Sequence, residues 1–408
     1  MGAPASRVDG GPVAGRGDLM APRTVGEIGE IELVERILTI LGGGSAAPSD
    51  APEGTRLVVG PGDDAAVLDA GGDVVVTTDS QHEGVHFERS WMSAEALGRR
   101  AIAVNASDVG AMGGEPLGFL AALALPGDTA ASWVERLAAG LAAGAARWGG
   151  RVIGGDVARL EGRVSINVTA VGRMPPGVAP VRRSGAAEGD LCWISGRPGR
   201  AAAGRALLAA GYRLAGDRLE LREDLVVGRN GAAVEAAAIR CIQAFIDPEP
   251  PVGLGAALAR DGLAAAMIDL SDGTGIDLRR LCEASGVGAC LDADPLLADP
   301  LLEALARALE GPAGARKGRP GAALDPAGAG RGSGPGAGVE RWILAGGDDY
   351  QLLGAVTEGN RERLVGAARR AGFEVRIVGR FTAAAEGLQL ARDGVRETLA
   401  ARGWDHFS

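Results

Sequence analysis

The amino-acid sequence predicts a mixed α/β fold in two modules, and three observations support this prediction. The chain has 408 residues, and at about 150 residues per domain this length suggests two or three domains. Helical apolar stripes alternate along the chain with short runs rich in β-branched residues, which is typical of α/β folds. A Pro/Gly cluster at 174–180 separates two such series, which predicts a domain boundary near residue 175.

The first module, 24–175, is expected to begin with a helix. Thr24 and Glu27 match a capping box, an apolar helical stripe follows them, and the glycines at 42–44 stop it. For the rest of this module, the apolar pattern predicts strands at 57–59, 65–68 and 74–78, a helix at 94–112, a strand at 117–125, a helix at 133–148, and strands at 152–153 and 164–171.

The second module, 176–408, repeats the mixture of helices and strands. We expect helices at 201–210, 232–245, 252–260, 277–284 and 296–309, and strands at 287–291, 342–344 and 351–356. A stretch at 311–338 has almost no apolar side chain to bury and is predicted to be a disordered insertion. The Gly/Ala/Pro-rich segment 1–23 is predicted to be a disordered tail.

Composition excludes several classes of protein. Lys317 is the one lysine among 42 basic residues, and it lies in the predicted insertion. Sites that need a lysine in a core, such as a Walker phosphate loop or a Schiff base, are therefore excluded. The net charge is -10 without a basic block, which argues against a nucleic-acid surface. Four well-separated cysteines and the lack of a long apolar run predict a soluble, cytoplasmic protein without a membrane segment.

Acidic and hydroxyl residues recur at the ends of predicted strands and in glycine turns. The six segments are GPGDDAAVL (Asp63, Asp64), VVVTTDS (Thr77, Thr78, Asp79), AVNASDVGAMGG (Asn105, Asp108), VIGGDV (Asp156), MIDLSDG (Asp269, Ser271, Asp272) and LAGGDDYQLL (Asp348, Asp349). In one shared site each carboxylate pair would cost about 4 kcal/mol at 4 Å, so the group would take up protons or bind cations. Oxygen ligands select Mg²⁺, Mn²⁺ or Ca²⁺, and Mg²⁺ bridges carboxylates to phosphates. Separate Asp-Gly turns explain the same pattern equally well.

One segment matches the zinc-protease signature H-E-x-x-H in form. It reads His82-Glu83-Gly84-Val85-His86, but that signature binds zinc only on a helix, where the two histidines share a face. A β-branched run leads into the segment and Gly84 lies at its centre, and both features oppose a helix. We therefore predict a strand followed by a turn, with one functional histidine.

Taken together in their order, the motifs carry a resemblance to a known family. They are GPGDDAAVL, TTDSQHEGVHF, ALGRRAIAVNASDVGAMGGEP, VIGGD, RRSGAAEGD, IDLSDG, GGDDYQLL and the terminal GWDHF. This ordered set resembles the thiamine-monophosphate kinases, which belong to the superfamily of aminoimidazole-ribonucleotide synthetase, over about residues 26–407 apart from the insertion. The resemblance implies ATP-dependent phosphorylation of thiamine monophosphate to thiamine diphosphate. It also implies a two-domain fold whose N-terminal sheet forms a barrel across a homodimer.

Residues at matching positions take their expected roles from the same resemblance. It implies Mg²⁺ ligation by Asp64, Thr77, Thr78, Asp79, Asp108, Asp156, Asp269 and Asp272. It implies ATP contacts from Gly155, Arg183 and Ser271, and contacts to thiamine phosphate from His86, Asp348 and Trp404. The acceptor is a phosphate oxygen that is already ionised at neutral pH, so no catalytic general base is expected, and metal-assisted in-line transfer suffices.

Some features depart from the family or have a second interpretation. Asp348 stands where the family usually has the longer Glu, and Val157 and Ala158 replace threonines that often follow the GGD motif. Arg183 read alone is a surface arginine, and Trp404 read alone is a packing residue. Two other functions stay open: another ATP-dependent synthetase of the same superfamily, and a protein that binds Mg²⁺ and nucleotide without turnover.

Overall fold

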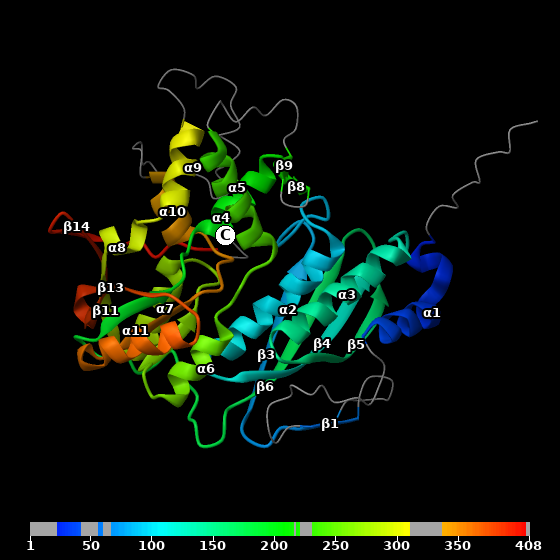
Figure 1. The fold of residues 1–408 in the computed structure, drawn as a ribbon, viewed down its shortest axis with the longest axis horizontal. Helices are drawn as coiled ribbons and strands as arrows, with labels where there is room; N and C mark the ends of the chain where they lie inside the picture. Colours follow the sequence, from blue (N-terminus) through cyan, green and yellow to red (C-terminus); the bar gives the residue numbers. More distant parts are fainter. Residues whose placement is uncertain are drawn as a thin grey trace, which may run out of the picture.

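Two α/β modules lie side by side in the computed structural model (Figure 1). The structure describes residues 23–41, 56–59, 67–215, 218–220, 231–310 and 337–404. The tail expected at 1–23 and the insertion expected at 311–338 fall almost entirely outside these residues, and so does Asp64. No helix of the described part is long and apolar enough to cross a membrane.

The N-terminal module is a four-stranded sheet with helices on one face. Its elements are α1 (Val25–Ile40), β1 (Arg56–Val59), β2 (Val67–Asp69), β3 (Val74–His82), α2 (Ala94–Ala111), β4 (Glu115–Leu125), α3 (Ala131–Arg147), β5 (Arg151–Arg159) and β6 (Ser165–Arg173). The sheet order is β3-β6-β4-β5, with only the β4–β5 pair parallel, while β1 and β2 form a separate pair. The described strands leave this sheet open at β3 and β5, so a barrel is not formed within the described residues.

Residue alternation explains why one face of this sheet is covered and the other is open. Along β6, Ile166, Val168 and Ala170 are buried in the core that α2 and α3 cover. On the opposite face, Val74 is 53% exposed and Val76 is 63% exposed. This opposite face, with Leu120 at 37% exposure, is called the open face below.

The C-terminal module is a seven-stranded sheet covered on both faces. Its elements are β7 (Leu191–Ser195), α4 (Arg200–Ala209), β8 (Arg213–Ala215), β9 (Arg218–Glu220), α5 (Gly231–Ile246), α6 (Val252–Arg260), β10 (Ala266–Asp269), α7 (Thr274–Ser285), β11 (Val287–Asp292), α8 (Ala293–Leu297), α9 (Pro300–Glu310), α10 (Ala337–Ala345), β12 (Leu352–Val356), α11 (Arg361–Arg370), β13 (Val375–Ala383), β14 (Leu388–Arg392) and β15 (Val395–Thr398). The sheet order is β10-β12-β7-β13-β11-β14-β15. Cys192 and Ile194 of β7 enter the core formed with α4, α5, α7, α9 and α10. Leu191 and Trp193 enter the core formed with α6 and α11.

Helix α2 links the modules. It packs against α3 and β3 in its own module and against α6 and β10 in the other. The α2–α6 crossing is close because both helices carry glycine there, and a Cβ on Gly255 would lie 1.9 Å from the carbonyl oxygen of Gly110. Residues at the ends of β3 and β10 are thereby brought near one another.

Two predictions about the second module were wrong. The segment 342–344, expected as a strand, lies inside α10, because Val339 and Ile343 are one helical turn apart and both face the core. The single helix expected at 296–309 is broken between α8 and α9. Asp299 and Pro300 start a new helix there, since Asp299 accepts hydrogen bonds from the backbone N–H groups of Leu301 and Leu302.

The prediction for the H-E-x-x-H segment was correct in its local structure. Strand β3 ends at His82, and a turn with Gly84 at φ +83° follows. The centres of the His82 and His86 rings lie 5.6 Å apart, and the ring planes are inclined by 53°. The segment is not a helix, so the zinc-protease interpretation is excluded.

Candidate active site

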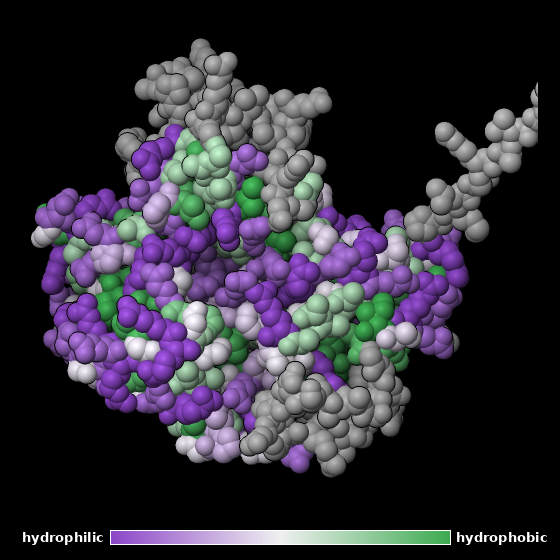
Figure 2. Space-filling view, viewed as in Figure 1, coloured by the Kyte–Doolittle hydropathy of each residue, from purple (hydrophilic) through white to green (hydrophobic). Residues whose placement is uncertain are grey.

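Four aspartates from both modules meet beside the α2–α6 crossing. Asp79 lies on β3, Asp108 on α2, and Asp269 and Asp272 lie at the end of β10. Burial, followed by the charges of Asp108 and Asp272, raises the pKa of Asp79 to about 7. Burial and the charge of Asp108 raise the pKa of Asp269 well above its usual value. We call these four residues the carboxylate cluster. On the face drawn in Figure 2, hydrophilic side chains dominate where the modules adjoin.

Hydroxyl and amide groups hold the cluster in place. Thr77 Oγ1 donates to Asp108 Oδ2 at 2.6 Å. Ser107 Oγ donates to Asp269 Oδ2 at 2.7 Å, and the backbone N–H of Asp79 donates to Asn105 Oδ1 at 3.0 Å. The two hydroxyl groups orient the carboxylates of Asp108 and Asp269, and Asn105 holds the backbone at Asp79.

Two arginines border the cluster. Arg280 Nη1 donates to Asp272 Oδ2 at 2.5 Å and to Asp277 Oδ1 at 2.7 Å. Burial raises the pKa of Asp108, and the Thr77 hydrogen bond and the charge of Arg183 oppose that rise. Arg183 therefore lies within electrostatic reach of the cluster although its side chain is exposed.

Several predicted ligands do not join the cluster. Thr78 faces the opposite side of β3 from Thr77 and Asp79, and its Oγ1 donates to the carbonyl oxygen of Val168 at 3.0 Å. Asp156 is exposed on β5, next to Gly155. Within the described residues no group of three or more His, Cys, Asp or Glu side chains is arranged to hold a metal ion.

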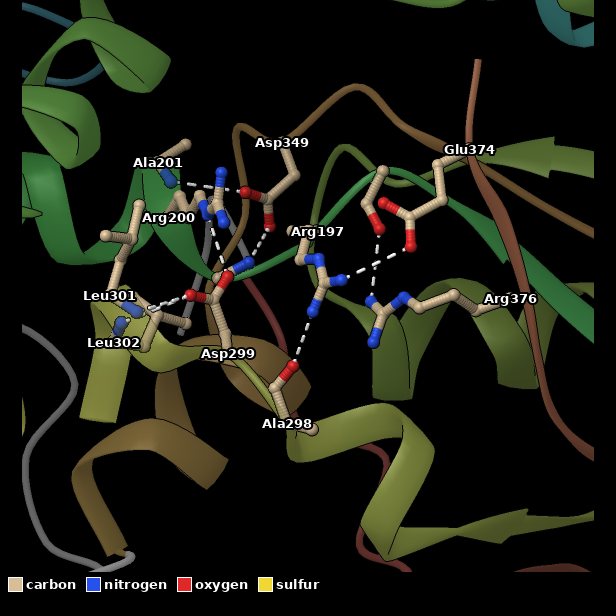
Figure 3. Close-up of polar contacts among 12 residues, drawn as sticks. Arg197, Arg200, Ala201, Ala298, Asp299, Leu301, Leu302, Asp349, Glu374 and Arg376 are labelled. Carbon is tan, nitrogen blue, oxygen red and sulfur yellow. Dashed lines mark hydrogen bonds and ion pairs between the residues drawn. The ribbon is translucent and has the colours of Figure 1, made fainter. Parts of the chain in front are cut away.

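The two aspartates of the GGDDY loop, residues 346–350, have different partners. Asp349 is buried and accepts from the backbone N–H groups of Gly199, at 2.7 Å, and Ala201, at 3.2 Å, at the start of α4 (Figure 3). Asp348 turns the other way and pairs with the fully buried Arg100. Asp348 has φ +70° and Tyr350 has φ +50°, a backbone region that residues other than glycine rarely adopt.

Of the other two predicted substrate contacts, His86 lies near Asp348 and Trp404 lies next to Asp272. The charge of His86 lies close enough to lower the pKa of Asp348. The Arg205 guanidinium lies over the ring of Trp404, 5.3 Å from the ring centre. The backbone N–H of Trp404 donates to the carbonyl oxygen of Asp272 at 2.9 Å, which places it next to the cluster. The Asp348 N–H donates to the carbonyl oxygen of Ser271 at 2.8 Å.

A hydrogen bond fixes the tautomer of neutral His86. Its Nδ1 lies 3.0 Å from the backbone nitrogen of His82 and must accept, because a backbone nitrogen can only donate. The ring hydrogen of neutral His86 is therefore on Nε2, which acts as a donor.

Sequence reasoning missed the residues that support the site rather than line it. Arg100, Ser107 and Asp277 each bind one of the aspartates described above or its neighbouring backbone. One signal was present: Arg100 and Ser107 are two helical turns apart and lie, with Asn105, among the mostly apolar buried residues of α2. A polar residue in such a position needs a buried partner.

Comparisons with known proteins agree with this geometry. The model of the family "AIR synthase related protein, N-terminal domain" matches residues 62–174. The thiamine-monophosphate kinase of Mycobacterium tuberculosis (strain CDC 1551) is 35% identical over 332 residues, which cover 81% of each chain. The crystal structure of the thiamine-monophosphate kinase of Stenotrophomonas maltophilia matches with a TM-score of 0.66 at 29% identity, covering 89% of this chain and 96% of that one. The structure of AaThiL complexed with AMPPCP and TMP matches with a TM-score of 0.62 at 27% identity, covering 93% of this chain and 98% of that one. The chain belongs to the thiamine-monophosphate kinase family.

Proposed function

We propose that this protein transfers the γ-phosphoryl group of ATP to thiamine monophosphate and releases thiamine diphosphate. The observation that carries the proposal is the carboxylate cluster, which both modules build and which lies beside the GGDDY loop. Family membership supports the same reaction, since relatives covering most of the chain are thiamine-monophosphate kinases and a similar structure is a complex with AMPPCP and TMP.

Magnesium is the cofactor we propose for the cluster. Its donors are carboxylate oxygens, which suit a hard cation. Burial disfavours the ionised forms of Asp79, Asp108 and Asp269, and repulsion from Asp108 adds to this effect at Asp79 and Asp269. Mg²⁺ usually takes only one or two carboxylates and completes its shell with water and substrate phosphates. Among the described residues no three such side chains form a metal site by themselves, so water and substrate phosphates would have to complete the shell of each ion. When bound, the metal neutralises charge on the phosphates.

We assign the ligand role to Asp79, Asp108, Asp269 and Asp272, with Thr77 orienting Asp108. Asp64, Thr78 and Asp156 stay predictions from the family resemblance.

The residues around the cluster suit two anionic substrates. Arg183 supplies a positive charge near Asp108 for the ATP phosphates, and Ser271 and Gly155 are the further ATP contacts we propose. His86 offers an Nε2 donor, and Trp404 offers a ring that already accepts a guanidinium on its face. We propose that these two residues and Asp348 contact thiamine monophosphate. The chain needs no general base, since the attacking phosphate oxygen carries its charge before it binds.

A phosphoryl-transfer assay tests the proposal. Purified protein is incubated with ATP and Mg²⁺, with either thiamine monophosphate or free thiamine as the acceptor. We expect thiamine diphosphate from the monophosphate and no product from free thiamine, because the acceptor group is a phosphate. Turnover of free thiamine alone, or of neither acceptor, would contradict the proposed function.

We further propose a homodimer that forms through the open face of the N-terminal sheet. Val74, Val76 and Leu120 place apolar surface on that face, and exposed apolar surface of this kind marks an interaction site. Val76→Glu is expected to halve the mass measured by light scattering. Val395→Glu is the matched control, since Val395 is 60% exposed on β15 of the other module. A monomeric wild type, or equal effects of both substitutions, would contradict this interface.

Two smaller proposals concern organisation and location. The two sheets use strands up to Arg173 and from Leu191 onward, which supports a boundary near residue 175. The four cysteines are free and buried, which supports the reducing environment of the cytoplasm.

A further inference from the structure

Arg100 is a fully buried arginine that joins four elements of the fold. It extends from α2 with 0% of its side chain exposed. Its Nε donates to Gln81 Oε1 on β3 at 3.3 Å, Nη1 donates to the carbonyl oxygen of Phe245 on α5, and Nη2 donates to Asp348 Oδ1 in the GGDDY loop. The guanidinium also lies 4.3 Å from the centre of the Phe245 ring and 5.8 Å from that of Tyr350. Each nitrogen of the group has its own partner.

The pair that Arg100 makes with Asp348 leaves one oxygen of the carboxylate available. Both hydrogen bonds to Asp348 within the described residues end on Oδ1, one from Arg100 and one from the Tyr350 hydroxyl at 3.2 Å. Oδ2 of Asp348 is therefore the acceptor left for a ligand, and 18% of this side chain is exposed. Burial alone would raise the pKa of Asp348, but Arg100, Arg205 and His86 outweigh it, and the pKa is lowered.

Contacts on both sides of Asp348 anchor the backbone of the loop. Asp348 has φ +70°, a region that Asp tolerates better than most residues but does not prefer. Its N–H is tied to Ser271 and its neighbour Asp349 is tied to α4, so the loop is anchored on both sides. Arg100 then determines where the short Asp348 side chain points.

We propose that Arg100 is a positioning residue for substrate specificity. It holds Asp348 as a carboxylate with Oδ2 turned to accept a hydrogen bond from the amino group of the aminopyrimidine ring of thiamine monophosphate. This inference rests on the proposed function and adds a residue that determines the binding of thiamine monophosphate. It also explains how a residue shorter than the family's Glu serves in this position, because the guanidinium of Arg100 fixes its direction.

Kinetics with both substrates distinguish positioning from a purely structural role. Arg100→Lys keeps the charge but cannot make the three separate hydrogen bonds. We expect KM for thiamine monophosphate to rise about tenfold, the loss of one charge-assisted hydrogen bond, with KM for ATP within about twofold of wild type. Arg173→Lys is the matched control, because Arg173 is also buried, at 5% side-chain exposure, and pairs with Glu115 away from the site. It should leave both KM values unchanged. Equal rises in both KM values of Arg100→Lys, or no change in either, would overturn the proposal.

Two further variants keep the test decisive. Asp348→Asn combined with Arg100→Lys should behave as Asp348→Asn alone, because Arg100 acts through Asp348; additive effects would overturn the proposal. If Arg100→Lys fails to fold, Tyr350→Phe removes the other donor to Oδ1 without changing charge and should raise KM for thiamine monophosphate about threefold. An unchanged KM would again overturn it.

Calorimetric binding of thiamine monophosphate separates this inference from the proposed function. If wild type binds thiamine monophosphate without turnover, the proposed function fails. Weaker binding by the variants would still support the role of Arg100, and unchanged binding would overturn it. A wild type that neither binds nor phosphorylates thiamine monophosphate overturns both.

Discussion

The pKa values of Asp79 and Asp348 are shifted in opposite directions because their surroundings differ. Asp79 has carboxylates as neighbours, and burial together with their charges raises its pKa to about 7. Asp348 is also largely buried, with 18% of its side chain exposed, but Arg100 and Arg205 lower its pKa. The first environment suits a site that exchanges protons for a metal ion, and the second suits a permanently charged acceptor.

The raised pKa of Asp79 predicts how stability depends on pH and magnesium. The folded pKa lies above the unfolded value of about 3.9, so the contribution of this group to stability is complete below about pH 4 and is lost as pH rises towards 7. Mg²⁺ binds the ionised form. We therefore expect Mg²⁺ to raise Tm more at pH 8 than at pH 5.5, measured by calorimetry without nucleotide.

A matched pair of variants completes this test. Asp79→Asn removes the titrating group and should reduce the gain in Tm at pH 8. It should also raise the Mg²⁺ concentration needed for half-maximal activity by at least about tenfold. Asp261→Asn is the control, because Asp261 pairs with Arg370 at 3.5 Å and its side chain is 40% exposed. Equal gains in Tm at both pH values, or an unchanged metal requirement in Asp79→Asn, would contradict a role of Asp79 as a ligand.

Among the elements, the start of α4 holds the GGDDY loop. Asp349 accepts hydrogen bonds from two backbone N–H groups there (Figure 3). Asp299 likewise accepts hydrogen bonds from two backbone N–H groups at the start of α9, and it also forms an ion pair with Arg200 at 2.7 Å. Both aspartates satisfy backbone N–H groups at the start of a helix, Asp299 as the residue just before α9 and Asp349 from the distant GGDDY loop. They differ in that Asp349 is the neighbour of Asp348, whereas Asp299 contacts no predicted site residue among the described ones.

Alanine substitutions at these two caps should separate stability from substrate binding. Asp349→Ala and Asp299→Ala each remove a capping carboxylate and should lower the free energy of unfolding by about 1–2 kcal/mol. Only Asp349→Ala should also raise KM for thiamine monophosphate, because it frees the loop that carries Asp348. Urea unfolding and steady-state kinetics measure both effects. An unchanged KM in Asp349→Ala would show that the loop is held without this cap.

The elements also show which parts of the fold the sequence could predict. Helices α2 and α3 and strand β4 have clear apolar periodicity, and they lie where it placed them. Strand β7 is buried on both faces. Its sequence LCWIS therefore does not alternate between apolar and polar residues, and periodicity could not predict it as a strand. The segment 342–344 was too short to distinguish a strand from a buried helix. Asp79 and Asp269 could be predicted as site residues from their motifs, but Arg100 could not, because its partner is 248 positions away.

In the molecule as a whole, the proposed site depends on the contact between the modules, because neither module supplies all four aspartates of the carboxylate cluster. Asp79 and Asp108 come from one and Asp269 and Asp272 from the other, and the Arg100–Asp348 pair crosses the same boundary. The α2–α6 crossing sets the separation of the modules next to these groups. A change in that separation alters the distance between the carboxylates that we propose to bind Mg²⁺.

Gly255→Ala tests this dependence directly. The added Cβ would lie 1.9 Å from the Gly110 carbonyl oxygen, so α6 must move away from α2, at a cost of about 1–3 kcal/mol in stability. Gly253→Ala is the matched control on the same helix, where the nearest atom to the new Cβ is 3.9 Å away and the higher helix propensity of alanine should stabilise slightly. We expect Gly255→Ala to lower kcat and raise the Mg²⁺ requirement at 25 °C, well below its Tm, and Gly253→Ala to change neither. Wild-type activity in a destabilised Gly255→Ala would show that the carboxylates keep their places without this crossing. Loss of stability and of metal affinity together would show that the helix crossing sets the geometry of the site.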